Sequence, residues 1–511
     1  MVPYERCPPV FITFFPSEDC AMSDLFPARR ARMEYVCTNC ASRFGIDELL
    51  YTCPACGGVF LLEDLDFADM RKEGPQAWRD RFDARRATRR SALRGVFRFY
   101  ELMAPVLEEE DIVYLGEGDT PIVPASSALR KATGLNFAFK NDGQNPSASF
   151  KDRGMAAALS YLNHLIRSRD LKDVLAVCAS TGDTSAAAAL YSAALGAGRV
   201  KSAVLLPKGK VTLPQLSQPL GAGAKVFELP GVFDDCMKVV EYLSENYQVA
   251  LLNSKNPWRV LGQESYAYEL AQQFDYEVGD LALFVPVGNA GNITAIMSGF
   301  LKMRRYGVIE QLPKIVAVQS SHADPVFKYY SQSPADRQYQ PVTVRPSVAQ
   351  AAMIGDPVSF PRVVKMAEAY HQADGRGRFH VVQVEEQDIM DNMIKANRCG
   401  LTICTQGGEG LAGLRQALKK GLVTQGERAV IDSTAHALKF AEFQNAYFDD
   451  RLQDGFEVTA KNELVNRPVD ISPQGVPLPE AGRSQSPADR AAYVSAAAAD
   501  IAKALGLRNK N

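Results

Sequence analysis

Short apolar runs alternate with helical patterns of apolar and polar residues from Phe137 onward. The runs are VLAVCAS, SAVLLP, AKVFELP, VALLNS, ALFVPVG, KIVAVQS, HVVQVE, LTICTQG and RAVIDST. The helical patterns that follow several of them cover 185–195, 234–247, 263–274, 292–306 and 437–447. Apolar runs separated by amphipathic helices are typical of parallel strands that are covered on both faces. The sequence therefore predicts an α/β fold with doubly wound parallel sheets.

Two glycine-bearing loops stand where such a fold binds ligands. Residues 180–185 (STGDTS) follow VLAVCAS, and residues 288–292 (GNAGN) follow ALFVPV. In doubly wound sheets ligands lie at the carboxyl ends of strands, where the free backbone N–H groups of a starting helix can bind a phosphate. Tight turns also need glycine, so one such loop alone is weak evidence.

Lys151 lies in NPSASFKDRG (145–154), directly before a helical stripe of apolar residues at Met155, Leu159, Leu162, Leu165 and Ile166. The start of a helix disfavours a cation. This lysine therefore either extends into solvent as a surface charge or has its pKa lowered for use as a nucleophile or base. The two loops and the lysine together favour a phosphate-bearing ligand.

Four cysteines form a C-x2-C-x12-C-x2-C pattern, with Gly57 and Gly58 after the second pair: Cys37, Cys40, Cys53 and Cys56. Two knuckles of this spacing can place four thiolates around a zinc ion, which stabilises a unit too small to fold alone. A redox C-x-x-C is the alternative. Four protein ligands leave no open position, so a zinc ion here is expected to be structural.

Composition argues against several classes of partner. The 57 basic and 59 acidic side chains of the 511 residues nearly balance, and no strip of basic residues alternates with aromatics. Nucleic acid and membrane surfaces are therefore not expected partners. No apolar run approaches the roughly 18 residues of a membrane-spanning helix. With the remaining cysteines scattered as in a reducing compartment, we expect a cytoplasmic protein.

An ordered set of motifs resembles the threonine synthase family, within the fold type II group of pyridoxal-phosphate enzymes. The motifs are GEGDTP (116–121), NPSASFKDRG (145–154), ASTGDTSAA (179–187), NSKNPWRVLGQ (253–263), PVGNAGN (286–292), IGDPVSFP (354–361) and STAHALKF (433–440). The resemblance covers roughly residues 114–448. It implies two doubly wound domains of the tryptophan synthase beta-like kind, preceded by a zinc-ribbon-like unit that many relatives share.

The resemblance implies the following domains. Residues 1–33 are an N-terminal arm, and 34–62 the zinc-ribbon-like unit. Residues 63–154 and 256–460 form a large cofactor domain, and 155–255 a small substrate domain. Residues 461–511 form a tail with a helical pattern at 488–505, and a charged stretch at 66–98 is expected to be a solvated helix.

The resemblance also assigns the cofactor site. Lys151 binds pyridoxal 5'-phosphate as a Schiff base and moves protons. The cofactor phosphate is bound by Gly288, Asn289, Ala290 and Gly291, and the pyridine nitrogen by Thr434. Asp183 stands beside the phenolic oxygen, where many relatives have Asn. An ionised carboxylate would repel a phenolate, so either Asp183 or the cofactor oxygen is expected to carry a proton.

The substrate implied by the resemblance is a phosphorylated amino acid. It is held by Ser180, Thr181, Asn253, Ser254, Arg259 and Asn292, with Thr184 near the reacting atoms. The planar, permanently charged fork of Arg259 suits a second phosphate. Relatives commonly have R-L-E-G-Q-K where this chain has RVLGQE, so Glu264 is a departure that bears on substrate orientation. Of the five histidines, His436 alone lies near a predicted site residue.

The implied reaction is O-phospho-L-homoserine plus water giving L-threonine plus phosphate, catalysed by a cytoplasmic lyase. A cysteate synthase-like replacement on phosphoserine and a threonine ammonia-lyase remain alternatives, because both would share Lys151. A non-catalytic zinc-ribbon scaffold on the same fold is the alternative from another class. Relatives are often dimers, which implies a possible homodimer.

Overall fold

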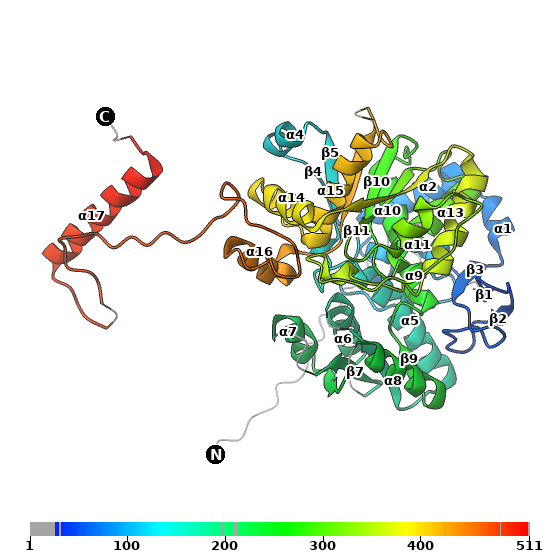
Figure 1. The fold of residues 1–511 in the computed structure, drawn as a ribbon. Coiled ribbons are helices and arrows are strands. Elements are labelled where there is room, and N and C mark those ends of the chain that lie inside the picture. Colours follow the sequence, from blue (N-terminus) through cyan, green and yellow to red (C-terminus); the bar gives the residue numbers. More distant parts are fainter. Residues whose placement is uncertain are drawn as a thin grey trace, which may run out of the picture. The chain divides into compact units, whose positions relative to one another are not determined.

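Six strands form the larger sheet of the computed structural model (Figure 1), in the order β12-β11-β10-β13-β5-β4. All neighbours are parallel except β4, which runs antiparallel to β5. Their bounds are β4 Ile122–Pro124, β5 Phe137–Asn141, β10 Leu281–Pro286, β11 Lys314–Ser320, β12 Phe379–Val384 and β13 Arg428–Ser433. Every residue of β10 is buried, as expected for a central strand covered on both faces.

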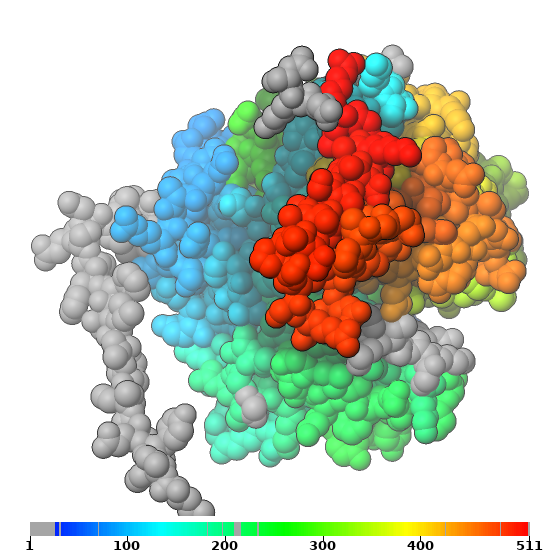
Figure 2. Space-filling model, turned by 90° about the vertical axis from the view of Figure 1, so that its left-hand side faces the viewer, coloured from blue at the N-terminus to red at the C-terminus, as the bar shows by residue number. Residues whose placement is uncertain are grey.

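Four parallel strands form the second sheet, in the order β8-β7-β6-β9. They are β6 Val174–Ala179, β7 Val200–Pro207, β8 Lys225–Leu229 and β9 Val249–Leu251. The helices α6 (Asp183–Leu195) and α8 (Phe233–Asn246) pack on these strands. This smaller domain forms the cyan and green lower part of the space-filling view (Figure 2). The two parallel sheets confirm the predicted fold class.

Helices surround the larger sheet, and α15 (Thr405–Lys419) packs directly on β10, β11, β12 and β13. The remaining α-helices among the described residues are α1 Phe67–Arg71, α2 Pro75–Ala84, α3 Tyr100–Met103, α4 Ser127–Thr133, α5 Lys151–Arg169, α7 Leu213–Gly221, α9 Pro257–Gln263, α10 Ser265–Gln273, α11 Gly291–Tyr306, α12 Pro325–Ser331, α13 Phe360–Asp374, α14 Glu386–Arg398, α16 Ala441–Phe448 and α17 Pro487–Leu505. Short 3-10 helices include η4 Gly95–Phe99, η6 Asp142–Gln144 and η8 Ala437–Phe440.

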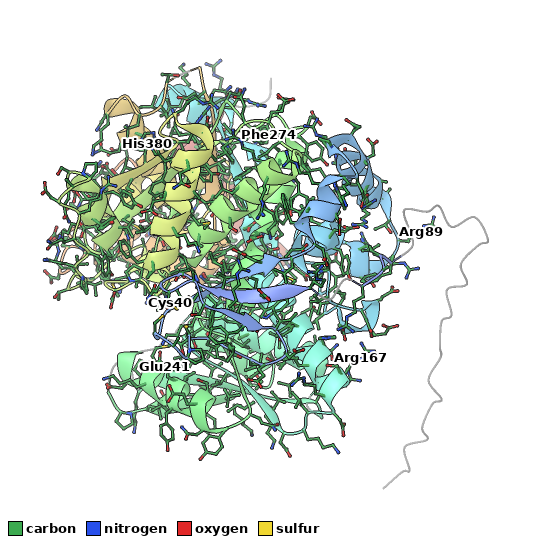
Figure 3. The ribbon with its side chains drawn as sticks, turned by 90° about the vertical axis from the view of Figure 1, so that its right-hand side faces the viewer. Cys40, Arg89, Arg167, Glu241, Phe274 and His380 are labelled. Atoms are coloured by element: carbon green, nitrogen blue, oxygen red, sulfur yellow. The ribbon has the colours of Figure 1, made fainter. Side chains whose placement is uncertain are left out.

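Three antiparallel strands hold the four-cysteine segment, in the order β2-β1-β3. They are β1 Met33–Cys37, β2 Arg43–Gly45 and β3 Phe60–Asp64. Figure 3 shows this small sheet, with Cys40 labelled, between the smaller domain below and the helices of the larger domain above. Residues 33–64 are called the cysteine unit below.

The structure describes residues 26–29, 32–180, 182–196, 198–208, 213–231, 233–424, 426–480 and 482–508. The chain divides into two units, Met1–Thr459 and Ala460–Asn511. The second unit contains α17, in agreement with the helical pattern at 488–505. None of the described helices is both long and apolar enough to cross a membrane.

Two sequence expectations differ from the structure. The stretch 66–98 is broken into α1, α2 and 3-10 turns, because Gly74 and Pro75 interrupt the helical pattern. It is also not uniformly solvated: Arg85 and Arg98 are buried, and Arg85 pairs with Glu101 at 2.7 Å. The run LTICTQG supplies only an isolated bridge at Ile403 before α15 begins.

Candidate active site

One cavity collects most of the predicted site residues. It lies where strands of both parallel sheets end and loops turn into helices, the place that doubly wound folds use for ligands. Its lining includes ten predicted residues: Lys151, Asp183, Ser254, Arg259, Gly288, Asn289, Ala290, Gly291, Asn292 and Thr434. Segments that are almost 300 residues apart in the sequence therefore converge on one site.

Lys151 is the first residue of α5 and is half-buried in the cavity wall. Burial, followed by the positive charge of Arg259, lowers the pKa of its amine to about 7. The carboxylates of Asp183 and Asp432 oppose that shift. A lysine with a pKa near neutrality can act both as a nucleophile and as a proton carrier. The surface-charge interpretation is thus not supported.

Backbone hydrogen bonds join the segment before Lys151 to the segment around Thr434. Phe150 N–H donates to Thr434 O at 2.8 Å, and His436 N–H donates to Ala148 O at 3.0 Å. Ser149 and Ala435 form an isolated antiparallel bridge between them. The two segments therefore lie side by side with a fixed register.

A buried charge network lies beneath the start of α5. Arg153 donates to Asp142 and to Glu269 at 2.7–2.8 Å, and all three side chains are fully buried. Lys140 also pairs with Glu269, and Thr120 of GEGDTP donates to Asp142 at 2.7 Å. Removing one partner of a buried pair costs about 3–5 kcal/mol, because it leaves an uncompensated charge. The network joins two of the sequence motifs, GEGDTP through Thr120 and NPSASFKDRG through Arg153, to Glu269 of α10.

The loop 288–291 leads from β10 into α11 and has the geometry of an anion site. Ala290 has a left-handed backbone with φ 62°, and Gly291 begins the 16-residue helix α11. A Cβ atom on Gly288 would lie 2.9 Å from Ala352 Cα, so a larger residue does not fit there. The N–H groups and dipole of the helix start can hold a phosphate against this loop.

Arg259 places a buried cation in the same cavity. Its side chain is 2% exposed, and burial lowers its pKa to about 10. Nη1 donates to Leu252 O at 2.8 Å, while the buried Nε has no partner among the described residues. A buried guanidinium with unused donors is well suited to bind an anion.

Comparison with known proteins agrees with this geometry. Residues 113–434 match the family described as pyridoxal-phosphate dependent enzyme. The chain is 35% identical over 406 residues to the threonine synthase of Methanocaldococcus jannaschii, covering 79% of this chain and 92% of that protein. The chain belongs to the threonine synthase family. Threonine synthase 2, chloroplastic, of Arabidopsis thaliana is 33% identical over 431 residues, covering 84% of this chain and 80% of its own.

Solved structures of the family share the fold. The structure of threonine synthase from Escherichia coli matches with a TM-score of 0.60 at 21% identity, covering 81% of this chain and 90% of that one. A threonine synthase from Brucella melitensis, solved with pyridoxal phosphate bound, matches with a TM-score of 0.58 at 17% identity, covering 81% and 91%. The family match over residues 113–434 and the relatives at 33% and 35% identity confirm the predicted family and the pyridoxal-phosphate cofactor.

Four predicted residues do not line the cavity or lie outside the described structure. Asn253 uses its side chain to bond Ala179 N and O, at 3.0 and 2.7 Å. Ser180 Oγ accepts from Gly182 N at 3.3 Å, and Thr184 lies in the first turn of α6. Thr181 lies outside the described residues. The roles of these residues therefore stay predictions.

The two departures from the family pattern have different surroundings. Asp183 pairs with Lys439, whose Nζ lies 3.0 Å from Asp183 Oδ1. Glu264 does not line the cavity: it is buried between helices, where it accepts from Tyr268 and Ser298 and pairs with Lys302. A direct contact between Glu264 and the substrate is therefore not expected.

Gln406 is a cavity residue that the sequence did not single out. It is 3% exposed, and neither Oε1 nor Nε2 has a partner among the described residues. It lies in LTICTQG, directly after an apolar run, and this position could have identified it. An unpaired buried amide at a cavity is a candidate ligand contact. His436, by contrast, uses Nδ1 to cap η8 at Leu438 N, at 3.2 Å.

The four cysteines of the cysteine unit converge on one point. Their sulfur atoms all lie within 4.8 Å of one another. Distances such as 3.4 Å between Cys37 and Cys56 and 3.7 Å between Cys40 and Cys53 are too long for a disulfide of about 2.05 Å. A Cβ on Gly58 would lie 2.9 Å from Cys37 Sγ, so the knuckle needs glycine at this position.

Proposed function

We propose that this protein converts O-phospho-L-homoserine and water to L-threonine and phosphate. The observation that carries the proposal is that Lys151 lines the same cavity as two separate elements suited to bind anions. One is the start of α11 at 288–291, and the other is Arg259. Two such elements suit a phosphate on the cofactor and a second phosphate on the substrate.

The residues present fit pyridoxal phosphate. We assign its phosphate to the backbone N–H groups of Gly288, Asn289, Ala290 and Gly291, with Asn292 beside them. Lys151 would hold the aldehyde carbon, Thr434 the pyridine nitrogen, and Asp183 would face the phenolic oxygen. When bound, the cofactor supplies an electron sink for charge that develops on the amino acid.

Lys151 is the proposed proton carrier. Once the substrate amine has displaced it, its free amine would take the proton from Cα and would have to pass it to the bound cofactor before taking one from Cβ, because an ammonium cannot accept a second proton; phosphate would then leave Cγ. Water adds at Cβ, and Lys151 returns protons to Cγ and Cα. An amine must be both acid and base in this sequence, which a pKa of about 7 permits.

We assign the substrate grip to other residues around the same cavity. Arg259 and Ser254 line the cavity. We propose that they bind the phosphate that is released, with Ser180, Thr181, Asn253 and Asn292 completing the grip and Thr184 near the reacting carbons. A bidentate guanidinium favours a doubly charged phosphate over an uncharged hydroxyl, which supports threonine synthase over threonine ammonia-lyase.

Phosphate release by the purified protein tests the proposal. The enzyme loaded with pyridoxal phosphate is given phosphohomoserine in one assay and phosphoserine with sulfite in another. We expect phosphate and threonine from the first. Release only in the second assay would replace the proposal by a cysteate synthase-like reaction, and a protein that stays colourless with the cofactor would point to a scaffold.

We also propose that Cys37, Cys40, Cys53 and Cys56 hold a structural zinc ion. Four thiolates at about 2.3 Å from zinc lie about 3.8 Å apart in a tetrahedron, close to the sulfur separations of 3.4 and 3.7 Å. Elemental analysis should find one zinc per chain, lost in Cys40→Ser and kept in Cys399→Ser. Cysteines that oxidise reversibly to disulfides without zinc would favour the redox alternative.

We further propose that the enzyme acts in the cytoplasm as a homodimer. Eight cysteines are free in the described part of the chain, which supports a reducing compartment. Light scattering of the purified protein tests the oligomeric state, and cell fractionation tests the location.

A further inference from the structure

Arg362 connects three parts of the protein that are distant in sequence. It lies in α13, is fully buried, and donates Nε to Phe60 O of the cysteine unit at 2.8 Å. Nη1 and Nη2 donate to Ser254 O and Lys255 O, both at 2.9 Å. A buried arginine that donates to main-chain carbonyls fixes the backbone of each segment that it contacts.

The same guanidinium is also connected to the loop 288–291, which is proposed to bind the cofactor phosphate and is called the cofactor loop below. Nη1 donates to Ser359 Oγ at 3.0 Å. The N–H of Ser359 in turn donates to Asn289 O at 3.2 Å. Arg362 thus contacts residues 254–255, called the substrate loop below, directly, and it contacts the cofactor loop through Ser359 of the 354–361 motif.

A second connection joins the cysteine unit to the helix of Arg259. Trp258 Nε1–H donates to Tyr35 OH of β1 at 3.0 Å, and both side chains are buried. The Trp258 ring stacks on Tyr161 of α5 at 3.8 Å with an interplanar angle of 11°. Trp258 immediately precedes Arg259 in the first turn of α9, so the contacts of its indole anchor the turn that carries Arg259.

A third connection holds the strand before the substrate loop. Leu251 N–H, at the end of β9, donates to Tyr51 OH of the cysteine unit at 3.0 Å. The loop then closes on itself, because Asn256 bonds both Leu251 O and Trp258 N at 2.9 Å. The cysteine unit is thus joined to residues 251–259 at three points, through Arg362, Trp258 and Leu251, and all three residues are buried.

We infer that the cysteine unit and Arg362 position the substrate-phosphate site, by fixing the loop at Ser254 and the start of the helix that carries Arg259. This inference rests on the proposed function for the identity of the substrate. Arg362 is a positioning residue, because its donors are used by protein oxygens and not by a ligand. The cysteine unit is then part of the substrate site and not an independent appendage.

Two variants of the full-length, cofactor-loaded protein test the inference. Tyr35→Phe removes the acceptor of the Trp258 bond, and Arg362→Lys keeps the charge but loses the fork. We expect each to raise KM for phosphohomoserine about tenfold, the effect of losing one or two well-placed hydrogen bonds. kcat should stay within about twofold in both variants, and the affinity for pyridoxal phosphate should stay within about twofold in Tyr35→Phe, which keeps the contact between Arg362 and Ser359. Tyr447→Phe is the matched control, since its buried hydroxyl donates to Asp391 at 2.9 Å, away from these connections.

Hydrogen exchange of the same proteins separates this inference from the proposed function. Amides of 252–264 should exchange faster in Tyr35→Phe and Arg362→Lys than in wild type, and at the wild-type rate in Tyr447→Phe. Unchanged exchange in both test variants would overturn the inference, as would a loss of cofactor affinity in Tyr35→Phe equal to its loss of substrate affinity. A wild type that releases no phosphate from phosphohomoserine would refute the proposed function, while the exchange rates would still decide this point.

Discussion

Lys439 Nζ lies 3.0 Å from Asp183 Oδ1, and both side chains are largely buried at the edge of the cavity. Lys439 also donates to Ser147 O at 2.8 Å and Gln218 Oε1 at 2.9 Å. The sequence predicted repulsion between the Asp183 carboxylate and a phenolate of the cofactor, relieved by a proton on one of the two. The ion pair with Lys439 offers another way to reduce this repulsion. The ammonium of Lys439 offsets part of the charge of the carboxylate that we propose to face the cofactor's phenolic oxygen.

Lys439→Met should leave the Asp183 carboxylate unbalanced. An uncompensated negative charge favours the protonated forms of its neighbours, so the pH midpoint of the absorbance change of the bound cofactor should rise. The double variant Asp183→Asn/Lys439→Met removes both charges and should return the midpoint towards the wild-type value. Absorbance titration measures all three proteins, and equal midpoints would show that the pair does not sense the cofactor.

Lys151→Ala should abolish covalent attachment of pyridoxal phosphate. Borohydride reduction followed by peptide mass spectrometry should label residue 151 in the wild type and leave the variant unlabelled. Activity should fall by roughly 10³-fold or more, because nucleophile and proton carrier are lost together. Lys328→Ala, at an exposed lysine of α12, is the control and should keep both label and activity.

The attachment of cofactor to the apoenzyme should depend on pH through Lys151. Only the unprotonated amine attacks an aldehyde, so the rate should rise with pH and reach half its limit near the lowered pKa of about 7. Arg259→Met removes a positive charge that lowers this pKa, and the midpoint should therefore move upwards. Stopped-flow absorbance checks this, and a midpoint that stays fixed in Arg259→Met would contradict the electrostatic coupling.

Arg259→Met should also weaken substrate binding more than cofactor binding. Loss of a charge-assisted contact to phosphate raises KM by roughly 10- to 100-fold, whereas the 288–291 loop still holds the cofactor. Steady-state kinetics and cofactor titration measure the two effects. Arg451→Met, at an exposed arginine paired with Asp449, should change neither quantity.

Gln406→Leu should stabilise the apoenzyme and weaken its ligand binding. The unpaired buried amide disfavours folding by about 1–3 kcal/mol when no ligand satisfies it, so Leu should raise the apoenzyme's Tm. If the amide contacts the cofactor, the affinity for pyridoxal phosphate should fall in the same protein. Thermal unfolding and cofactor titration check the two parts, and a variant with unchanged affinity would exclude a cofactor contact.

The sequence predicted those features that local pattern encodes. The run ALFVPVG became β10, and the adjoining GNAGN became the start of α11, because strand and turn chemistry are both local. Lys151 and Arg259 were found because the family motifs mark them. Asp183 and Lys439 both lie in family motifs, but nothing in the sequence indicated that they form a charge pair across 256 positions. Arg98 was predicted to be solvated, but it is buried and its Nη1 donates to Gln272 Oε1 at 2.7 Å, a contact between residues 174 positions apart.

The backbone ladder between Phe150 and Thr434 has a consequence for how this chain can vary. Main-chain hydrogen bonds of 2.8 and 3.0 Å join the segment before Lys151, proposed to hold the aldehyde end of the cofactor, to the segment of Thr434, proposed to hold its pyridine nitrogen. The distance between the two groups is therefore fixed by the main chain of these segments. Substitutions along 148–150 or 434–436 that keep these hydrogen bonds should leave that distance unchanged. Insertion of a single residue in either segment would shift the register and move one group relative to the other.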